Sequence, residues 1–560
     1  MDRIWLKSYP PGVPAEIDPN RLRSIKELLE GTCAANADRV AFVQMGTGIT
    51  YRELDQLSRA FAAWLQLSGF KKGDRLAIML PNTLQYPIAL FGALRAGLVV
   101  VNTNPLYTAA ELEHQLVDSG ATAILVLENF AHVVQAVLPR TKLKHVLFTA
   151  VGDFLGFPKS WIVNFVIRHV RKQVRRWRIE GATDFKAALA KGQSWKFTPV
   201  ALDPEDLAFL QYTGGTTGVA KGAMLSHRNM CSNVLQAEAW ITTYFNNEKG
   251  VLITPIPLYH IFALMANCFL FARLGWKNVL IINPRDFPAV IAEMKKYPFA
   301  FITGVNTLFN ALLHAPGFEK IDFSSLRITL GGGMAVQEAV AKRWKEATGG
   351  RILTQAWGLT ETSPGACINP PNAEFNGSIG LPIPSTEISI KDDSGNDLPI
   401  GQAGEICVRG PQVMLGYWNR PDETAKVMLP EGWLRTGDIG RMDEAGFVYI
   451  EDRKKDMILV SGFNVYPNEV EAVAATHPGI LEAAAVAQPD EHSGEVVALF
   501  VVRKDPALTE RDVIEFCRKS LAGYKTPKHV YFRQELPKTN VGKILRKALR
   551  DELTKAAEPA

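Results

Sequence analysis

A loop rich in glycine and threonine is the segment of this 560-residue chain best suited to holding phosphate groups. The loop is Tyr212-Thr-Gly-Gly-Thr-Thr-Gly-Val-Ala-Lys-Gly222, and it follows an apolar run at 207–210 that we expect to be a strand. Glycines let backbone N–H groups approach a phosphate closely, and the threonine hydroxyls and Lys221 add further donors. The loop is not a Walker A sequence, because Ala220 precedes Lys221 and Gly222 follows it. An ordinary turn is the alternative, but the full eleven-residue pattern favours phosphate binding.

Four later segments complete a series that resembles the acyl-adenylate-forming superfamily, which includes acyl-CoA synthetases, peptide-synthetase adenylation domains and beetle luciferases. In chain order they are Gly331-Gly-Gly-Met-Ala335, Trp357-Gly-Leu-Thr-Glu361, Thr436-Gly-Asp438 and Pro537-Lys-Thr-Asn-Val-Gly-Lys543. Each alone has a plain structural alternative: a tight turn, a core tryptophan, a turn cap or a solvated lysine. Their order is that of the superfamily, so the resemblance covers most of the chain.

The resemblance implies an ATP site. The residues that would hold or surround the nucleotide are Thr213, Gly214, Gly215, Thr216, Thr217, Gly218, Lys221, Gly331, Gly332, Gly333, Trp357, Gly358, Asp438 and Arg453. Within this set, Asp438 and Arg453 would bind the ribose hydroxyls. Glu361 and Thr216 would hold Mg²⁺, a hard cation that prefers oxygen ligands, and Thr360 would contact the α-phosphate. Where the superfamily commonly has Gly-Tyr, this chain has Ala356-Trp357.

The resemblance also implies a carboxylate substrate and a catalytic lysine. Pro257-Leu-Tyr-His260-Ile-Phe262 matches an aromatic-His segment that would place His260 near the substrate carboxylate, although a lone histidine is more often a core residue. The expected acyl pocket consists of His260, Leu264, Gly304 and Val305. No Asp occurs between Ile261 and Cys268, which favours an uncharged acyl chain. Lys543 would supply positive charge where negative charge develops as the carboxylate attacks phosphorus.

The C-terminal region resembles the part of the superfamily that rotates between two half-reactions. Lys455 occupies the hinge position, for which an ordinary surface charge is the alternative. The segment that would line the tunnel for coenzyme A contains Ser461, Gly462, Phe463 and Asn464. Rotation about Lys455 would withdraw Lys543 and admit the thiol.

The elements that must position these residues follow from the alternation of short apolar runs with helical patterns. We expect strands at 75–80, 98–101 and 123–127, with helices at 82–96 and 108–119 between them. This pattern predicts an α/β fold with a large N-terminal domain of parallel sheets covered by helices. We expect a domain at 1–451 with a β-rich subdomain at 376–451, a hinge at 452–456, and a small mobile α+β lid domain at 457–560.

Charge and cysteine usage exclude several classes of protein. The 62 Lys and Arg residues against 57 Asp and Glu give a net charge of +5. The window 151–180 contains seven basic and two acidic residues, a net charge that is also +5. The rest of the chain is therefore balanced, and a basic surface for binding nucleic acid is not expected.

The six cysteines form no CxxC pair, which favours a reducing cytoplasm over disulfides or a zinc ribbon. The N-terminal stretch lacks a signal-peptide core, and the apolar stretch 251–276 contains polar and proline interruptions typical of a buried core.

The basic window predicts a peripheral membrane contact. Taken as a helix, 161–178 carries apolar residues on one face and basic residues on the other, the pattern of an interfacial amphipathic helix. We therefore expect a cytoplasmic protein associated with the inner face of the membrane. The alternatives are a helix that packs on the core and exposes its basic face to solvent, or a helix that contacts a protein partner.

The run 431–455 gives the most specific resemblance, which is to bacterial long-chain fatty-acid–CoA ligases. It implies AMP-forming activation of a fatty acid through an acyl-adenylate, with ATP, Mg²⁺ and coenzyme A, and release of AMP and pyrophosphate. The product would feed fatty-acid degradation or lipid synthesis. Three alternatives stay open: an adenylating enzyme that loads a carrier protein, a luciferase-like oxidation, and a non-enzymatic lipid-binding protein. A homodimer is also left open, and neither chain-length preference nor regulation follows from the sequence.

Overall fold

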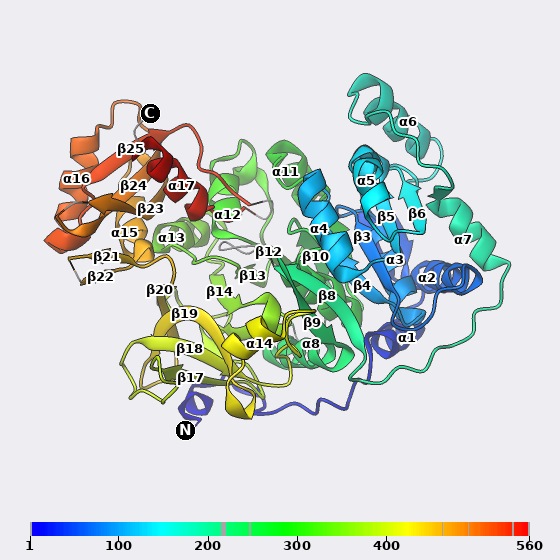
Figure 1. Cartoon of the computed structure of the whole chain (residues 1–560), viewed down its shortest axis with the longest axis horizontal. Helices are drawn as coiled ribbons and strands as arrows, with labels where there is room; N and C mark the ends of the chain where they lie inside the picture. Colours follow the sequence, from blue (N-terminus) through cyan, green and yellow to red (C-terminus); the bar gives the residue numbers. More distant parts are fainter. Residues whose placement is uncertain are drawn as a thin grey trace.

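The computed structural model describes residues 3–213, 220–245, 248–461, 463–490, 492–539 and 542–557. Figure 1 shows the large N-terminal domain, the antiparallel sheet β17–β20, and the small C-terminal domain beside them. The α/β fold expected from the sequence is confirmed, with parallel sheets in a large N-terminal domain and a small domain at the C-terminus.

A seven-stranded sheet forms the first half of the large domain, in the order β7-β6-β5-β3-β4-β8-β9. Its strands are β3 (Arg75–Met79), β4 (Val99–Asn102), β5 (Ala123–Leu127), β6 (His145–Thr149), β7 (Thr183–Asp184), β8 (Leu207–Thr213) and β9 (Lys221–Ser226). Every residue of β4 and β5 is buried, as expected for parallel strands covered on both faces. The covering helices include α2 (Tyr51–Leu67), α3 (Gln85–Arg95), α4 (Ala109–Ser119), α5 (Ala131–Val137) and α7 (Phe185–Gln193).

A nine-stranded sheet forms the second half, in the order β16-β15-β14-β13-β12-β10-β11-β1-β2. Its strands are β1 (Val40–Gln44), β2 (Thr47–Thr50), β10 (Val251–Thr254), β11 (Lys277–Leu280), β12 (Phe301–Gly304), β13 (Ile328–Gly331), β14 (Leu353–Gly358), β15 (Gly365–Ile368) and β16 (Leu381–Pro382). The six strands from β14 to β1 in this order are parallel to one another. The edge strands β2, β15 and β16 are added in antiparallel pairs. The helices of this half include α1 (Ile25–Ala35), α8 (His227–Ile241), α11 (Phe287–Lys296), α12 (Asn306–His314) and α13 (Glu338–Ala347).

Two smaller sheets follow. An antiparallel sheet contains β17 (Glu387–Lys391), β18 (Gly404–Arg409), β19 (Leu434–Met442) and β20 (Val448–Arg453), with α14 (Pro421–Val427) before β19. The C-terminal sheet contains β21 (Ile458–Val460), β22 (Phe463–Val465), β23 (Ile480–Asp490), β24 (Gly494–Arg503) and β25 (His529–Arg533), with α15 (Pro467–Ala475), α16 (Glu510–Arg518) and α17 (Arg546–Ala557). The apolar cores of this last domain are separate from the core of the large domain.

The prediction of an amphipathic helix over 161–178 is wrong in its extent, because the helical segment ends near residue 170. The chain is helical in α6 (Lys159–Phe165) and in a π-helical turn at Val166–Val170, and the segment after Arg171 is irregular. Beyond the helix, the chain follows tertiary contacts rather than helical periodicity: the Trp177 ring packs against Phe148, with 5.0 Å between the ring centroids. Among the described residues, no helix is long and apolar enough to cross a membrane.

The contact between α2 and α7 depends on a glycine. A Cβ atom added at Gly192 would lie 1.9 Å from the carbonyl oxygen of Ala60, so the two helix backbones could not keep their separation. We predict that Gly192→Ala lowers the free energy of unfolding by about 1–3 kcal/mol, the usual cost of overpacking. Urea unfolding of the full chain measures this change.

Gly31→Ala is the matched control, because Gly31 lies within α1 and a Cβ there meets nothing within 4 Å. We expect it to be neutral or to stabilise by about 0.5–1 kcal/mol, since alanine is the better helix former. Equal stability of the two variants would contradict the close packing of α2 on α7.

Candidate functional site

A cavity of about 1020 Å³ collects side chains from both halves of the large domain and from the C-terminal domain. The sequence-predicted residues that line it are Thr213, Lys221, His260, Gly332, Gly333, Trp357, Gly358, Thr360, Glu361, Arg453, Lys455 and Lys543. Gly214, Gly215, Thr216, Thr217, Gly218 and Gly462 lie outside the described residues. The structure thus brings together predicted residues that are more than 300 positions apart in the chain.

Asp438 does not line the cavity itself, but its buried carboxylate contacts two residues that do, Trp357 and Arg453. The Trp357 indole N–H donates to Asp438 Oδ2 at 2.9 Å, and Arg453 Nε lies 2.9 Å from Asp438 Oδ1. Asp438 and Arg453 face each other on the neighbouring strands β19 and β20. Buried carboxylates require such donors. The three residues predicted for adenine and ribose therefore form one connected group.

One corner of the cavity contains Glu361, which lies in a short 3₁₀ turn after β14. The Tyr417 hydroxyl donates to Glu361 Oε1 at 2.7 Å, and burial together with the Glu361 charge raises the pKa of Tyr417. Lys221, at the start of β9, forms an ion pair with Glu423 of α14. The hydrogen bond from Lys221 lowers the pKa of Glu423 to about 2. Sequence reasoning missed Tyr417, which precedes α14, and Glu423, which lies in its first turn, because no motif marks either residue.

Lys543 reaches the cavity from a loop of the C-terminal domain. The loop is held from inside by Thr539, whose hydroxyl accepts from the Lys543 N–H at 3.1 Å. It is held from outside by Thr307, whose hydroxyl donates to the Gly542 carbonyl at 3.0 Å. Gly333 has φ +78°, and a Cβ there would lie 3.2 Å from Lys543 Cε, so glycine leaves room for the lysine. Burial, with Arg453 nearby, lowers the pKa of Lys543 to about 8.

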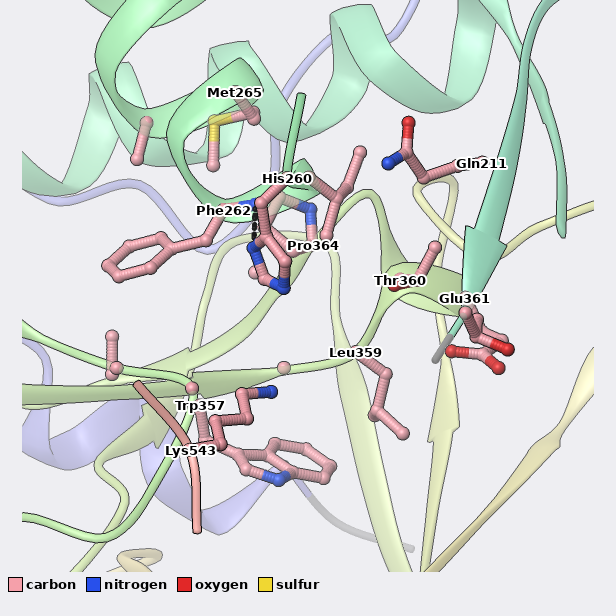
Figure 2. A pocket seen from close by; sticks show the side chains of 18 of the residues that line it. Gln211, His260, Phe262, Met265, Trp357, Leu359, Thr360, Glu361, Pro364 and Lys543 are labelled. Atoms are coloured by element: carbon pink, nitrogen blue, oxygen red, sulfur yellow. Dashed lines mark hydrogen bonds between the residues drawn. The ribbon is translucent and has the colours of Figure 1, made fainter. Parts of the chain in front are cut away.

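His260 faces the same cavity as a neutral imidazole. Its Nδ1 accepts from the Phe262 N–H at 3.3 Å (Figure 2), so its Nε2 carries the proton in the neutral ring. Burial, with the nearby Lys543 charge, lowers the pKa of His260 to about 3. His260 can therefore donate a hydrogen bond to a bound carboxylate or phosphate oxygen without being a cation.

A buried hydrogen-bond network that sequence reasoning missed holds the segment before His260. Gln211 donates to the Tyr259 carbonyl at 2.8 Å and accepts from Asn102 at 2.9 Å. The Tyr86 hydroxyl donates to Asn102 Oδ1 at 2.7 Å and contacts the Leu258 carbonyl at 2.9 Å. These residues lie on β8, β4 and α3, so the first sheet positions the histidine loop of the second half.

The cavity becomes apolar beyond His260. The apolar residues that line it there are Ala237, Ile241, Phe262, Met265, Ala266, Leu270, Phe301, Ile328, Leu330 and Ile368. Three residues predicted for the acyl pocket, Leu264, Gly304 and Val305, are buried but do not line the cavity. Gly331 also does not line it, and pairs with Gly304 in the sheet. The site therefore joins a polar end with charged groups to an apolar end without them.

The predicted hinge and tunnel residues occupy different places. Lys455 lines the cavity, and burial with the Arg453 charge lowers its pKa. Ser461, Phe463 and Asn464 are exposed outside the cavity. The Phe463 ring lies against Tyr524 at 5.0 Å between centroids, so this face of the C-terminal domain offers aromatic surface to solvent.

Comparison with known proteins matches two family models. The AMP-binding enzyme model matches residues 29–418, and the model of the AMP-binding enzyme C-terminal domain matches residues 469–543. The chain is 56% identical to a long-chain-fatty-acid–CoA ligase of Escherichia coli O6:H1, over 99% of this chain and 98% of that protein. It is 38% identical to a long-chain-fatty-acid–CoA ligase of Bacillus subtilis, over 98% of each chain.

Solved structures agree in fold. The crystal structure of ATP-bound MatB from Rhodopseudomonas palustris matches with a TM-score of 0.82 and 26% identity, over 96% of this chain and 100% of that one. An anthranilate CoA ligase in complex with anthranoyl-AMP matches with a TM-score of 0.86 and 24% identity, over 97% of this chain and 100% of that one.

The pKa of Lys543 gives a pH-dependence prediction. Because the pKa is lowered to about 8, the fraction of cationic Lys543 falls as pH rises through 8. A step that needs this charge slows accordingly, and kcat/KM for ATP should fall about tenfold per pH unit above that point. Pyrophosphate exchange measured between pH 6 and 10 tests this fall in rate at high pH.

Lys543→Arg tests the assignment, because a guanidinium stays charged throughout this pH range. Its residual activity should lack the fall near pH 8. A fall in rate at the same pH in the arginine variant would contradict the view that deprotonation of Lys543 causes it.

Proposed function

Because the chain belongs to the family of AMP-binding enzymes, we propose that it activates long-chain fatty acids as acyl-CoA through an acyl-adenylate. The observation that carries this proposal is the single cavity that joins a polar corner with Asp438, Glu361 and Lys543 nearby to an apolar end. The 56% identity to long-chain-fatty-acid–CoA ligases over nearly the full chain supports the same substrate class. An apolar end without charged residues suits a fatty chain rather than an amino acid.

In the first half-reaction, the fatty carboxylate attacks the α-phosphorus of ATP and pyrophosphate leaves. Both reactants are anions, so the site must hold them together against their repulsion. Lys543 provides positive charge at the reacting oxygens, and His260 donates a hydrogen bond from Nε2. Lys221 binds the departing pyrophosphate, Thr360 contacts the α-phosphate, and Asp438 with Arg453 holds the ribose.

Glu361 fits the role of a Mg²⁺ ligand. A carboxylate offers about four acceptor sites, so Glu361 can hold a cation while it accepts from Tyr417. Mg²⁺ typically takes one or two carboxylates and completes its shell with phosphates and water. When bound, Mg²⁺ neutralises phosphate charge. Tyr417 orients the Glu361 carboxylate toward that position.

In the second half-reaction, the thiol of coenzyme A attacks the acyl carbonyl and AMP leaves. Lys543 lines the cavity beside Gly333 in the described arrangement. We propose that the lid domain, residues 457–560, rotates about the hinge at 452–456 with Lys455 as its pivot. The exposed face with Ser461, Phe463 and Asn464 then lines the path of the pantetheine arm.

Lys543→Ala separates the two half-reactions. We predict at least a hundredfold loss of oleate-dependent pyrophosphate exchange, because an electrostatic contact to the reacting atoms is removed. Conversion of supplied oleoyl-AMP to oleoyl-CoA should stay within about threefold of the unmodified protein, since Lys543 has withdrawn by then. Equal loss of both activities would contradict the assignment of Lys543 to the first step only.

We further propose that the surface around α6 binds the inner face of an anionic membrane and keeps this cytoplasmic enzyme near its apolar substrate. Phe157 and Trp161 are 91% and 64% exposed, which is unusual for large aromatic side chains. The exposed basic residues that follow are Arg171, Lys172, Arg175, Arg176 and Arg178. Arg168 is also exposed, but it forms an ion pair at 2.9 Å with the buried carboxylate of Glu128. Each cation near an anionic leaflet contributes about 1 kcal/mol.

Sedimentation with phosphatidylglycerol vesicles tests this surface. We expect binding at low salt that weakens at 0.5 M salt, because the Debye length falls from about 30 Å at 0.01 M to about 4 Å. The double variant Phe157→Ser, Trp161→Ser should bind at least fivefold more weakly. Trp195→Ser is the matched control, because Trp195 is also exposed, at 52%, but lies outside α6 and the basic segment. No sedimentation at either salt, or equal binding by the double variant, would refute the membrane contact.

A further inference from the structure

Asp438 is held by donors from two different elements before any ligand is considered. Its side chain is almost completely buried, with the residue 2% exposed. The Trp357 indole N–H, from β14, donates to Oδ2, and Arg453, from β20, faces Oδ1, each at 2.9 Å. The backbone N–H of Asp438 donates to the Thr436 hydroxyl at 3.1 Å. Neither the carboxylate nor its backbone is free to turn.

The side chain at position 357 can act here only as a donor. An indole has one N–H and no acceptor, so Trp357 places its ring edge toward the carboxylate. Figure 2 shows the indole nitrogen on the edge of the ring turned away from His260. Trp357 thus contributes its ring to the wall of the cavity and its N–H to Asp438.

Two engaged oxygens still leave acceptor capacity. A carboxylate has about four acceptor sites, and two of them are taken by Trp357 and Arg453. In the proposed ATP site these two remaining acceptor sites would bind the two neighbouring hydroxyls of the ribose, and a deoxynucleotide would offer only one of those hydroxyls.

We propose that Trp357 is a positioning residue whose indole N–H sets the orientation of the Asp438 carboxylate and so makes the enzyme selective for ribonucleotides over deoxynucleotides. The inference rests on the proposed ATP site, in which Asp438 binds the ribose. A purely structural role would be to satisfy a buried carboxylate, which would affect stability but not the choice of sugar.

The test compares ATP with 2′-deoxy-ATP and 3′-deoxy-ATP in oleate-dependent pyrophosphate exchange. The ratio of kcat/KM values within one variant cancels losses of folded protein. Trp357→Phe keeps an aromatic ring and removes the donor. We expect it to reduce the preference for ATP over each deoxynucleotide about tenfold, as the loss of a hydrogen bond to a charged group implies.

A second variant guards against misfolding. An isostere of tryptophan in which sulfur replaces the ring N–H, incorporated at position 357, keeps the shape of the side chain and should reduce the preference equally. Trp344→Phe is the matched control, because its indole N–H donates to the Thr329 hydroxyl at 3.1 Å in the core, away from the cavity. This control should lose stability and keep the preference.

Asp438→Ala distinguishes failure of this inference from failure of the ribose assignment. If Asp438→Ala abolishes the preference while Trp357→Phe and the isostere keep it within twofold, the role of Trp357 is overturned and the ribose site stands. If Asp438→Ala also keeps the preference, both the ribose assignment and the inference are overturned. If all three variants lose the preference and Trp344→Phe does not, the inference is supported.

Discussion

The proposed two-step reaction depends on one constraint: the positive charge of Lys543 must be inside the cavity during the first step and must leave before the second. The cavity lowers the pKa of Lys543 to about 8 because burial disfavours its charge. The lysine therefore belongs on a separate domain, which can move, rather than on the sheet that holds Glu361. The contacts of Thr307 and Gly333 with its loop show how the large domain receives that lysine.

The same loop is connected to the domain junction by a cluster of ionic contacts. Arg546, three residues after Lys543, lies 2.7 Å from Glu471 and 3.3 Å from Asp452. Arg550, one helical turn later, lies 2.8 Å from Asp456. Asp452 ends β20 together with Arg453, which in turn contacts Asp438. Short contacts therefore link the proposed hinge, the Lys543 loop and Asp438, and the proposed rotation of the C-terminal domain would alter all three together.

The sequence predicted those parts of the molecule that local pattern determines. The strand at 123–127 was predicted residue for residue, because a short apolar run buried on both faces has no competing pattern. Lys221, Glu361 and Lys543 were named from motif spacing, and the fold brings them to one cavity. The extent of the helix at 161–178 was wrong, because the packing of Trp177 on Phe148 outweighs helical periodicity.

Contacts between distant segments could not be predicted in the same way. Tyr417 reaches Glu361, and Glu423 reaches Lys221, only because α14 and its preceding turn fold back over β9. Gln211 supports the His260 loop through its side-chain amide, and nothing in its neighbours marks that role. Even Trp357, which was singled out for its ring, has its main observed contact through its N–H to Asp438.

The central claim is that one cavity forms an acyl-adenylate from a long fatty acid. A single-turnover experiment with enzyme in excess over radiolabelled ATP, with Mg²⁺ and oleate but without coenzyme A, tests it most directly. The account predicts that enzyme-bound oleoyl-AMP and free pyrophosphate appear together, and that added coenzyme A converts the adenylate to oleoyl-CoA and AMP. Formation of ADP, or consumption of ATP without any acyl-adenylate, would contradict the account.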